Sequence, residues 1–178
     1  MFPAACYVGY MASRTMISVE EYLRTVYRPD CDYVDGEVQE RNLGEWDHSR
    51  AQAKILWRLG EYENCPGLQV FPSLRLRVSE TCVRVPDVCA FLESPAEQAP
   101  RTPPFLCVEV VSPEDTLMRM RERVDDYLGM GVPYVWVLDP SAKCAYAITP
   151  REGWREVKGG VLRTENPALG MPLAEIFA

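Results

Sequence analysis

Two apolar runs, each with a single carboxylate inside it, stand out in the pattern of hydrophobic and polar positions. The first is Val85-Pro86-Asp87-Val88, and the second extends over 105–113, with Glu109 at its centre. Runs of this length, rich in Val, Phe and Leu and bounded by Pro, predict buried strands. A carboxylate in a buried strand is costly to desolvate unless a positive charge meets it. If the two strands lie side by side, Asp87 and Glu109 come together.

Each carboxylate also has a simpler interpretation. Asp87 could be a turn residue after Pro86, and Glu109 could pair with one of the many arginines. A third possibility is a purely structural carboxylate pair. Two carboxylates at one point repel each other, so the pair favours a cation site. Hard cations such as Mg²⁺ or Mn²⁺ take oxygen ligands, often one or two carboxylates plus water.

Periodicity and turn residues predict the remaining elements. In chain order they are a helix over 18–27, a hairpin over 31–40 around Asp35-Gly36, a helix over 46–64 capped by Asp47 or Ser49, strands over 68–71 and 74–78, a run over 82–85 leading into the Asp87 strand, a loop over 93–104, a helix over 116–130, a strand over 134–138, short antiparallel strands over 145–148, 154–157 and 161–164, and a final turn over 173–177. The order strand, helix, strand over 105–138 predicts parallel strands joined by a right-handed crossover. The fold class is therefore a mixed α/β or α+β domain with a mixed sheet.

Length and composition suit one globular domain. The chain has 178 residues, of which 47% are hydrophobic and 25% charged, and no apolar run approaches the ~20 residues of a membrane helix. The opening residues lack the basic segment of a signal peptide, and Met11 and Met16 are plausible alternative starts. We therefore expect residues 1–15 to be a disordered or non-native extension, and 16–178 to form the domain. No membrane is expected as a partner.

The cysteine pattern indicates the redox environment of the protein, and the net charge limits how it can bind nucleic acid. The seven cysteines include no CxxC pair, which favours reduced, buried thiols in a cytoplasmic protein. The net charge of −7 argues against a surface that binds nucleic acid through phosphate contacts alone. A local basic cleft stays open, because 16 of the 19 basic residues are Arg. Arg77 and Arg84 could contact phosphates, or they could be solvated or paired with nearby acids.

Further motifs carry a family resemblance. They are Tyr33-Val34-Asp35-Gly36-Glu37, His48, Pro86-Asp87-Val88, the segment 108–113, Tyr127 with Gly131-Val132-Pro133, and the segment 136–140. In this order they resemble the Uma-type family of restriction-endonuclease-like proteins, from about Ser18 to the C-terminus. That family is similar to the PD-(D/E)XK nuclease superfamily.

The resemblance implies a central mixed sheet flanked by helices, with Mg²⁺ or Mn²⁺ at the sheet edge. It implies that Asp87 and Glu109 are metal ligands, with the backbone carbonyl of Val110 as a third. It also implies nucleic acid, most of all DNA, as the substrate and a homodimer as the assembly, and C₂ dimers are the commonest oligomers. The leading hypothesis is a metal-dependent endonuclease.

One departure from the superfamily pattern bears on catalysis. The lysine expected two positions after Glu109 is Val111, and the lysine that the family places four residues before its tyrosine is Arg123. Arg keeps the charge and can hold a phosphate, but it is a poor proton donor or acceptor. With Arg123, the residues His48 and Glu37 complete the expected site. His48 also has a simpler interpretation, as a solvated or cap-adjacent residue in the first turn of the helix over 46–64. The alternative function is a catalytically degenerate nuclease fold that binds nucleic acid or protein.

Overall fold

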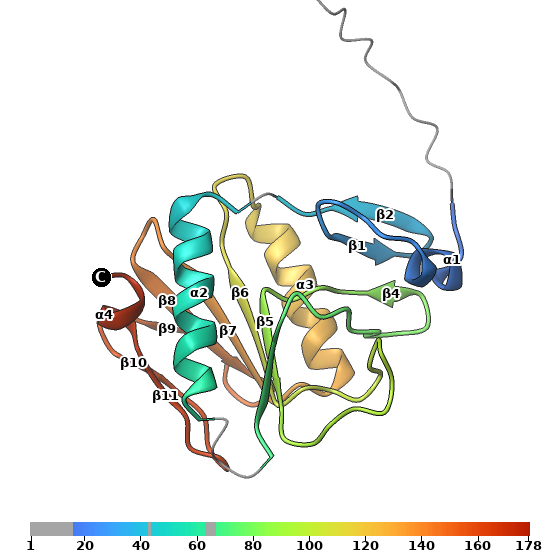
Figure 1. Ribbon diagram of the computed structural model, residues 1–178. Helices are drawn as coiled ribbons and strands as arrows, with labels where there is room; N and C mark the ends of the chain where they lie inside the picture. The colour runs from blue at the N-terminus through green and yellow to red at the C-terminus, as the bar shows by residue number, and fades with distance from the viewer. Residues whose placement is uncertain (1–15, 43, 63–66) are drawn as a thin grey trace, which may run out of the picture.

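A six-stranded mixed sheet forms the centre of the protein in the computed structural model, which describes residues 16–42, 44–62 and 67–178 (Figure 1). The strand order is β3-β5-β6-β7-β8-β9. The bounds are Gln69–Pro72 for β3, Val88–Phe91 for β5, Leu106–Val110 for β6, Tyr134–Asp139 for β7, Cys144–Thr149 for β8 and Gly153–Val157 for β9. Only β6 and β7 pair in parallel. The predicted mixed sheet and its parallel pair are confirmed.

Helices cover both faces of this sheet. Alternate residues of a strand point to opposite faces, so β6 directs Leu106 and Val108 into one core and Cys107 into the other. Helix α2 (Trp46–Gly60) and the short α4 (Leu173–Ile176) pack on the first face. Helix α3 (Leu117–Met130) packs on the second. This three-layer arrangement places the N-termini of α2 and α3 at the same end of the molecule (Figure 1).

A small N-terminal unit lies beside that end. Helix α1 (Val19–Arg24) begins where Ser18 accepts a hydrogen bond from the amide of Glu21. Strands β1 (Cys31–Val34) and β2 (Glu37–Glu40) form the predicted hairpin, and β4 (Cys82–Val83) pairs with β1. Asp35 and Gly36 both have positive φ, as tight hairpin turns require. The hairpin therefore holds Asp32 and the start of the following loop against the sheet.

Several predicted elements were wrong in extent or pairing. The segment 74–78 is no strand and makes one isolated bridge, from Leu76 to Arg84, because the amide of Arg77 donates instead to Pro100 in a neighbouring loop. The N-cap of α2 is Glu45, which makes no side-chain capping bond, rather than Asp47 or Ser49.

The C-terminal strands also differ from the prediction. Strand β10 (Val161–Arg163) pairs with β11 (Gly170–Pro172), a strand that the sequence pattern did not indicate, and not with β9. Helix α2 ends at Gly60, whereas the predicted helix extends to 64. The last two predicted positions, 63 and 64, belong to the segment 63–66, which lies outside the described residues. The prediction for residues 1–15 also lies outside them. Among the described residues, no helix combines the length and apolarity needed to cross a membrane.

Candidate active site

Strand pairing brings Asp87 and Glu109 together. Strands β5 and β6 are antiparallel, with Val88 opposite Val108, so continuing the register by one residue places Asp87 opposite Glu109. Asp87 immediately precedes β5 rather than lying inside a strand, which corrects the prediction at this position. Both side chains are buried, and Glu109 has no exposed surface. Two acids far apart in the sequence thus meet at the end of the sheet.

A single arginine nitrogen joins the two carboxylates. Nη2 of Arg41 lies 2.7 Å from Oδ1 of Asp87 and 3.4 Å from Oε2 of Glu109. Arg41 follows β2 directly, so the hairpin delivers it to the site. The interpretation of Glu109 as an arginine partner therefore holds in this structure. The same geometry shows that the two carboxylate oxygens converge on one positively charged point.

The other oxygen of Asp87 is held by the backbone and by α2. Oδ2 accepts a 2.7 Å hydrogen bond from the amide of Val110 and lies 3.4 Å from Nε2 of His48. His48 belongs to the first turn of α2, and Gln52 one turn later donates to the carbonyl of Asp87. These contacts fix both the backbone and the carboxylate of Asp87.

Helix α3 supplies the remaining partners of Glu109. The hydroxyl of Tyr127 donates a 2.5 Å hydrogen bond to Oε1 of Glu109. One turn earlier, Nη1 of Arg123 lies 3.7 Å from Oε2 of the same residue. The structure therefore places Arg123, like His48, beside the two carboxylates.

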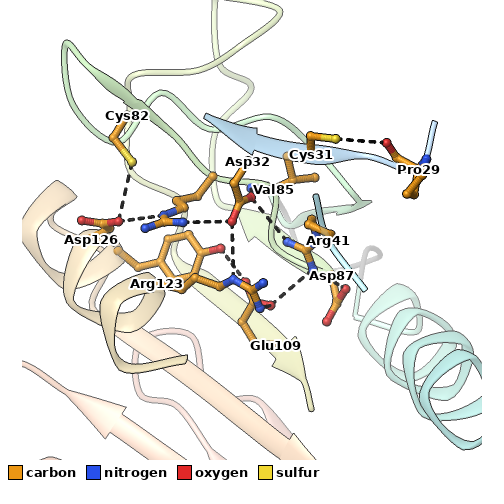
Figure 2. Close-up of polar contacts among 12 residues, drawn as sticks. Pro29, Cys31, Asp32, Arg41, Cys82, Val85, Asp87, Glu109, Arg123 and Asp126 are labelled. Atoms are coloured by element: carbon orange, nitrogen blue, oxygen red, sulfur yellow. Dashed lines mark hydrogen bonds and ion pairs between the residues drawn. The ribbon is translucent and has the colours of Figure 1, made fainter. Parts of the chain in front are cut away.

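Asp32 is a member of the site that the sequence interpretation missed. Its Oδ2 lies 3.0 Å from Nη1 of Arg84 and 3.4 Å from Nε of Arg123, and its Oδ1 accepts the amide of Val85 at 3.0 Å. Figure 2 shows Asp32 between Arg41 on one side and Asp126 on the other. Asp32 is a lone carboxylate in a short apolar strand, the same signal that identified Glu109, and that signal could have found it.

The network contains more carboxyl groups than arginines. Three buried or nearly buried arginines, Arg41, Arg84 and Arg123, meet five carboxylates. The five are Asp32, Asp87, Glu109, Asp115 and Asp126. Buried charges require partners of opposite sign. The excess of carboxylates gives this part of the protein a capacity for additional cationic charge.

A small cavity opens beside Asp87. It has a volume of about 170 Å³, and its lining includes Asp87, Arg41, His48, Asp30 and Ser73. Two buried nitrogens of this lining, Nη1 of Arg41 and Nδ1 of His48, have no hydrogen-bond partner among the described residues. Because an unsatisfied buried donor or acceptor costs about 1–3 kcal/mol, this arrangement is typical of a site that receives a polar ligand or water.

The donor set suits a hard cation that keeps water ligands. Asp87 and Glu109 offer oxygen atoms, and the Arg41 nitrogen between them shows that positive charge fits there. In the part of the chain that the structure describes, no group of three or more His, Cys, Asp or Glu side chains is arranged to hold a metal ion. Two carboxylates with water completing the shell is a mode that Mg²⁺ uses.

Burial and charge shift the pKa values of the site in different directions. Burial raises the pKa of Glu109 to about 7, against the opposing effect of Arg41. For Asp87 burial acts the same way, but hydrogen bonding from His48 and the charge of Arg41 outweigh it and lower the pKa. Burial alone would lower the pKa of His48, yet its contact with Asp87 raises it.

The pKa of Glu109 predicts a pH-dependent stability. Between the ordinary value of 4.5 and about 7, the folded protein holds a proton that the unfolded chain has released. Raising the pH across this range therefore lowers the free energy of unfolding. We expect Glu109→Gln to flatten this fall, measured by urea unfolding at pH 5 and pH 8.

His48 also contributes to the pH dependence of stability, and its share must be measured separately. Its pKa is higher in the folded protein than in the unfolded chain. The resulting stabilisation is present below the pKa of the unfolded chain and is lost as the pH rises through the pKa of the folded protein, so it has the same sign as that of Glu109. The variant His48→Gln measures that share. Equal pH dependence in the wild type and Glu109→Gln would contradict the assignment of Glu109.

Glu37, Val110 and Lys54 complete the set of residues considered for the site. Glu37 begins β2, opposite Val34 and at the other end of that strand from Arg41, and its role in the site stays a prediction. Val110 contributes its amide to Asp87, and the metal-binding role of its carbonyl stays a prediction. Lys54 donates to the carbonyls of Ile176 and Ala178 at the C-terminus, so it supplies no lysine to the site.

Comparisons with known proteins agree with this architecture. A search of curated proteins found no match. A crystal structure of a putative nuclease belonging to DUF820 from Anabaena variabilis is similar in fold, with a TM-score of 0.81. It has 17% sequence identity and covers 90% of this chain and 97% of that chain. The model of the Uma2 family, described as "Putative restriction endonuclease", matches residues 19–174. Because this match extends over most of the sequence, the chain belongs to the Uma2 family.

Proposed function

We propose that the protein is a metal-dependent nuclease that hydrolyses phosphodiester bonds of nucleic acid, most of all DNA. The observation that carries the proposal is the convergence of Asp87 and Glu109 on one cationic point beside a cavity. Membership of the Uma2 family supports nuclease chemistry in general. The dependence on Mg²⁺ or Mn²⁺ and the choice of DNA are the finer parts of the proposal.

Asp87 and Glu109 would hold the metal, and the carbonyl of Val110 is the third ligand that the family resemblance implies. When bound, the metal would polarise the scissile phosphate and make water a better nucleophile. The contacts of Asp87 with Val110 and of Glu109 with Tyr127 keep each carboxylate in one orientation. Such orientation of ligands by neighbouring groups is a general requirement of metal sites.

The two arginines of the site have roles that need no proton transfer. Arg41 lines the cavity, and Arg123 lies behind Glu109. Arg remains protonated and suits binding of phosphate oxygens. His48 lines the cavity as well and can exchange a proton near neutral pH. We assign phosphate binding to Arg41, charge compensation to Arg123 and proton transfer to His48.

Direct cleavage assays test this function. The purified protein is incubated with plasmid, single-stranded DNA and RNA, in Mg²⁺, in Mn²⁺ and in EDTA. We expect cleavage of DNA with either metal and none in EDTA. Failure to cleave all three substrates in both metals, or cleavage that continues in EDTA, would contradict the proposal.

A second candidate function is binding without turnover. Two observations favour it: Arg41 already places a positive charge between the carboxylates, and Arg123 stands where the family has a lysine. A catalytically degenerate protein would retain nucleic acid or bind a protein in the same assay without cleaving. The variant Arg123→Lys separates the two cases, because cleavage appears only if the missing lysine is what limits the enzyme.

Three further expectations belong to this proposal. We infer a single domain over 16–178, a homodimer and a cytoplasmic location. The free thiols of the five described cysteines support a reducing environment. Sedimentation equilibrium tests the dimer, because a monomer at micromolar concentration would exclude it.

A further inference from the structure

A larger groove continues from the catalytic cavity. It has a volume of about 750 Å³ and shares two lining residues, Asp30 and Ser73, with the cavity that contains Asp87. The segments that follow β3 and β5 line the groove, together with Leu23 of α1 and the exposed Val26 that comes after this helix. A strand that lies in the groove therefore reaches the cavity that Asp87 lines without leaving the protein surface.

Three arginines line this groove: Arg75, Arg77 and Arg101. Only two acidic residues, Asp30 and Glu97, line it with them. The protein as a whole has a net charge of −7, whereas arginines outnumber acids among the residues that line the groove. Glu80 and Glu20, which pair with these arginines, lie outside that lining. A local excess of arginine beside an active site attracts an anionic substrate even when the protein is acidic.

The positive charge of Arg75 has no carboxylate partner among the described residues. Its guanidinium donates to the carbonyls of Leu23 and Thr25 and lies 4.8 Å from the ring centroid of Tyr22. These contacts fix the side chain but leave the charge uncompensated. The arginine therefore adds a fixed positive potential to the groove.

Arg77 and Arg101 have partners that are easily exchanged. Both pair with Glu80, whose side chain is 75% exposed, and Arg77 also lies 3.9 Å from Glu20, whose side chain is 62% exposed. In the pair of Arg101 with Glu80 both side chains are exposed. Exposed ion pairs contribute little net free energy, so a phosphate can replace Glu80 there at low cost. Nε of Arg77 is also buried without a hydrogen-bond partner among the described residues. That nitrogen offers a donor to an acceptor that a bound strand can supply.

We infer that this groove binds the sugar–phosphate backbone of a nucleic-acid strand and leads it to Asp87 and Glu109. Arg77 and Arg101 contact phosphates, and Arg75 adds electrostatic attraction. The inference rests on the proposed nuclease function and deepens it, because it assigns the path of the substrate. Arginine binds phosphate oxygens with paired N–H donors, and such contacts make binding strongly dependent on salt.

Binding measurements without turnover test the inference. Fluorescence anisotropy is recorded in EDTA with a labelled single strand and with the corresponding duplex, between 50 and 200 mM salt, roughly the range over which phosphate contacts change affinity. The variants are Arg77→Gln with Arg101→Gln, and Arg101→Gln alone. The control is Arg155→Gln, because Arg155 is an exposed, Glu152-paired arginine of β9 at the opposite edge of the sheet.

We expect the double variant to bind at least about tenfold more weakly at the lowest salt. For each phosphate that the variant no longer binds, the slope of log affinity against log salt should fall by about 0.7 with a single strand and by about 0.9 with a duplex. The variant Arg101→Gln alters an exposed side chain, so it keeps the test valid if the Arg77 change impairs folding. The nucleic acid whose affinity falls more is the one that the groove accommodates.

The outcomes separate this inference from the proposed function. If the groove variants bind nucleic acid more weakly but the wild type cleaves no substrate, the groove is the binding site and the proposed nuclease function is wrong. If the wild type cleaves and the groove variants bind nucleic acid as tightly as Arg155→Gln does, the groove is not the binding site and the proposed nuclease function stands. A wild type that binds neither strand nor duplex at 50 mM salt overturns the inference.

Discussion

Asp87→Asn is expected to lower the rate of metal-dependent cleavage by at least about 100-fold. The substitution keeps the shape of the side chain and an oxygen for the Val110 amide, but removes the charge that faces Arg41. A metal ion supplies several kcal/mol of transition-state stabilisation, and each ~1.4 kcal/mol is tenfold in rate. Initial rates on plasmid at saturating Mn²⁺ measure the reduction.

The matched control is Asp35→Asn. Asp35 is an exposed carboxylate in the turn of the N-terminal hairpin, and its hydrogen bond from Thr81 survives the change to an amide. We expect this variant to cleave at the wild-type rate. If Asp87→Asn retains more than about a tenth of the activity while folded, a ligand role for Asp87 is wrong.

Asp32→Asn is expected to lower the free energy of unfolding by about 3 kcal/mol. Asp32 is 2% exposed, pairs with Arg84 and Arg123, and accepts a hydrogen bond from the amide of Val85. In the Asn variant, the side-chain NH₂ group faces an N–H donor of one of these partners. The buried Arg84 and Arg123 also lose the negative charge of Asp32. Removing one partner of a buried ion pair typically costs about 3–5 kcal/mol.

Urea unfolding measures this effect through the transition midpoint. The midpoint should fall while the slope m stays constant, because the substitution does not change the surface area that unfolding exposes. Asp35→Asn, three residues along in the same hairpin, again serves as the control and should change stability by less than about 0.5 kcal/mol, as a typical surface substitution does. Equal midpoints for Asp32→Asn and Asp35→Asn would show that the Asp32 network is not a stabilising element.

The position of the two carboxylates could be predicted from local pattern. A lone acid in a buried apolar run is an unusual sequence feature, and it appears at Asp87 and at Glu109. The antiparallel register of β5 and β6 then makes them neighbours. Asp32 shows the same feature in β1, where it is less distinct because the strand has only four residues.

Arg41 could not be found in this way. It lies in the polar segment between β2 and α2, where no periodicity marks one residue above another. Its place between Asp87 and Glu109 depends on how the hairpin packs on the sheet, and this packing joins residues 46 and 68 positions apart. Arg123 was found only through the family resemblance, because its position in α3 has no distinctive pattern.

The segment 74–78 illustrates the limit of alternation as a signal. The strict alternation of Leu74, Leu76 and Val78 with two arginines predicted a strand, and only Leu76 forms a bridge. Alternation still indicated that Arg75 and Arg77 share a side, and both line the groove. Leu74 lines it as well, so the alternation does not separate the side chains of this segment completely, and the neighbouring loops decide the backbone pairing.

Calorimetric titration with Mn²⁺ measures whether Asp87 and Glu109 form a cation site. We expect saturable binding to the wild type that is abolished in Glu109→Gln. We also expect tighter binding in Arg41→Gln, because Nη2 of Arg41 lies where positive charge is held between the two carboxylates. Absence of Mn²⁺ binding in all three proteins, or binding unaffected by Glu109→Gln, would contradict a cation site at these two residues.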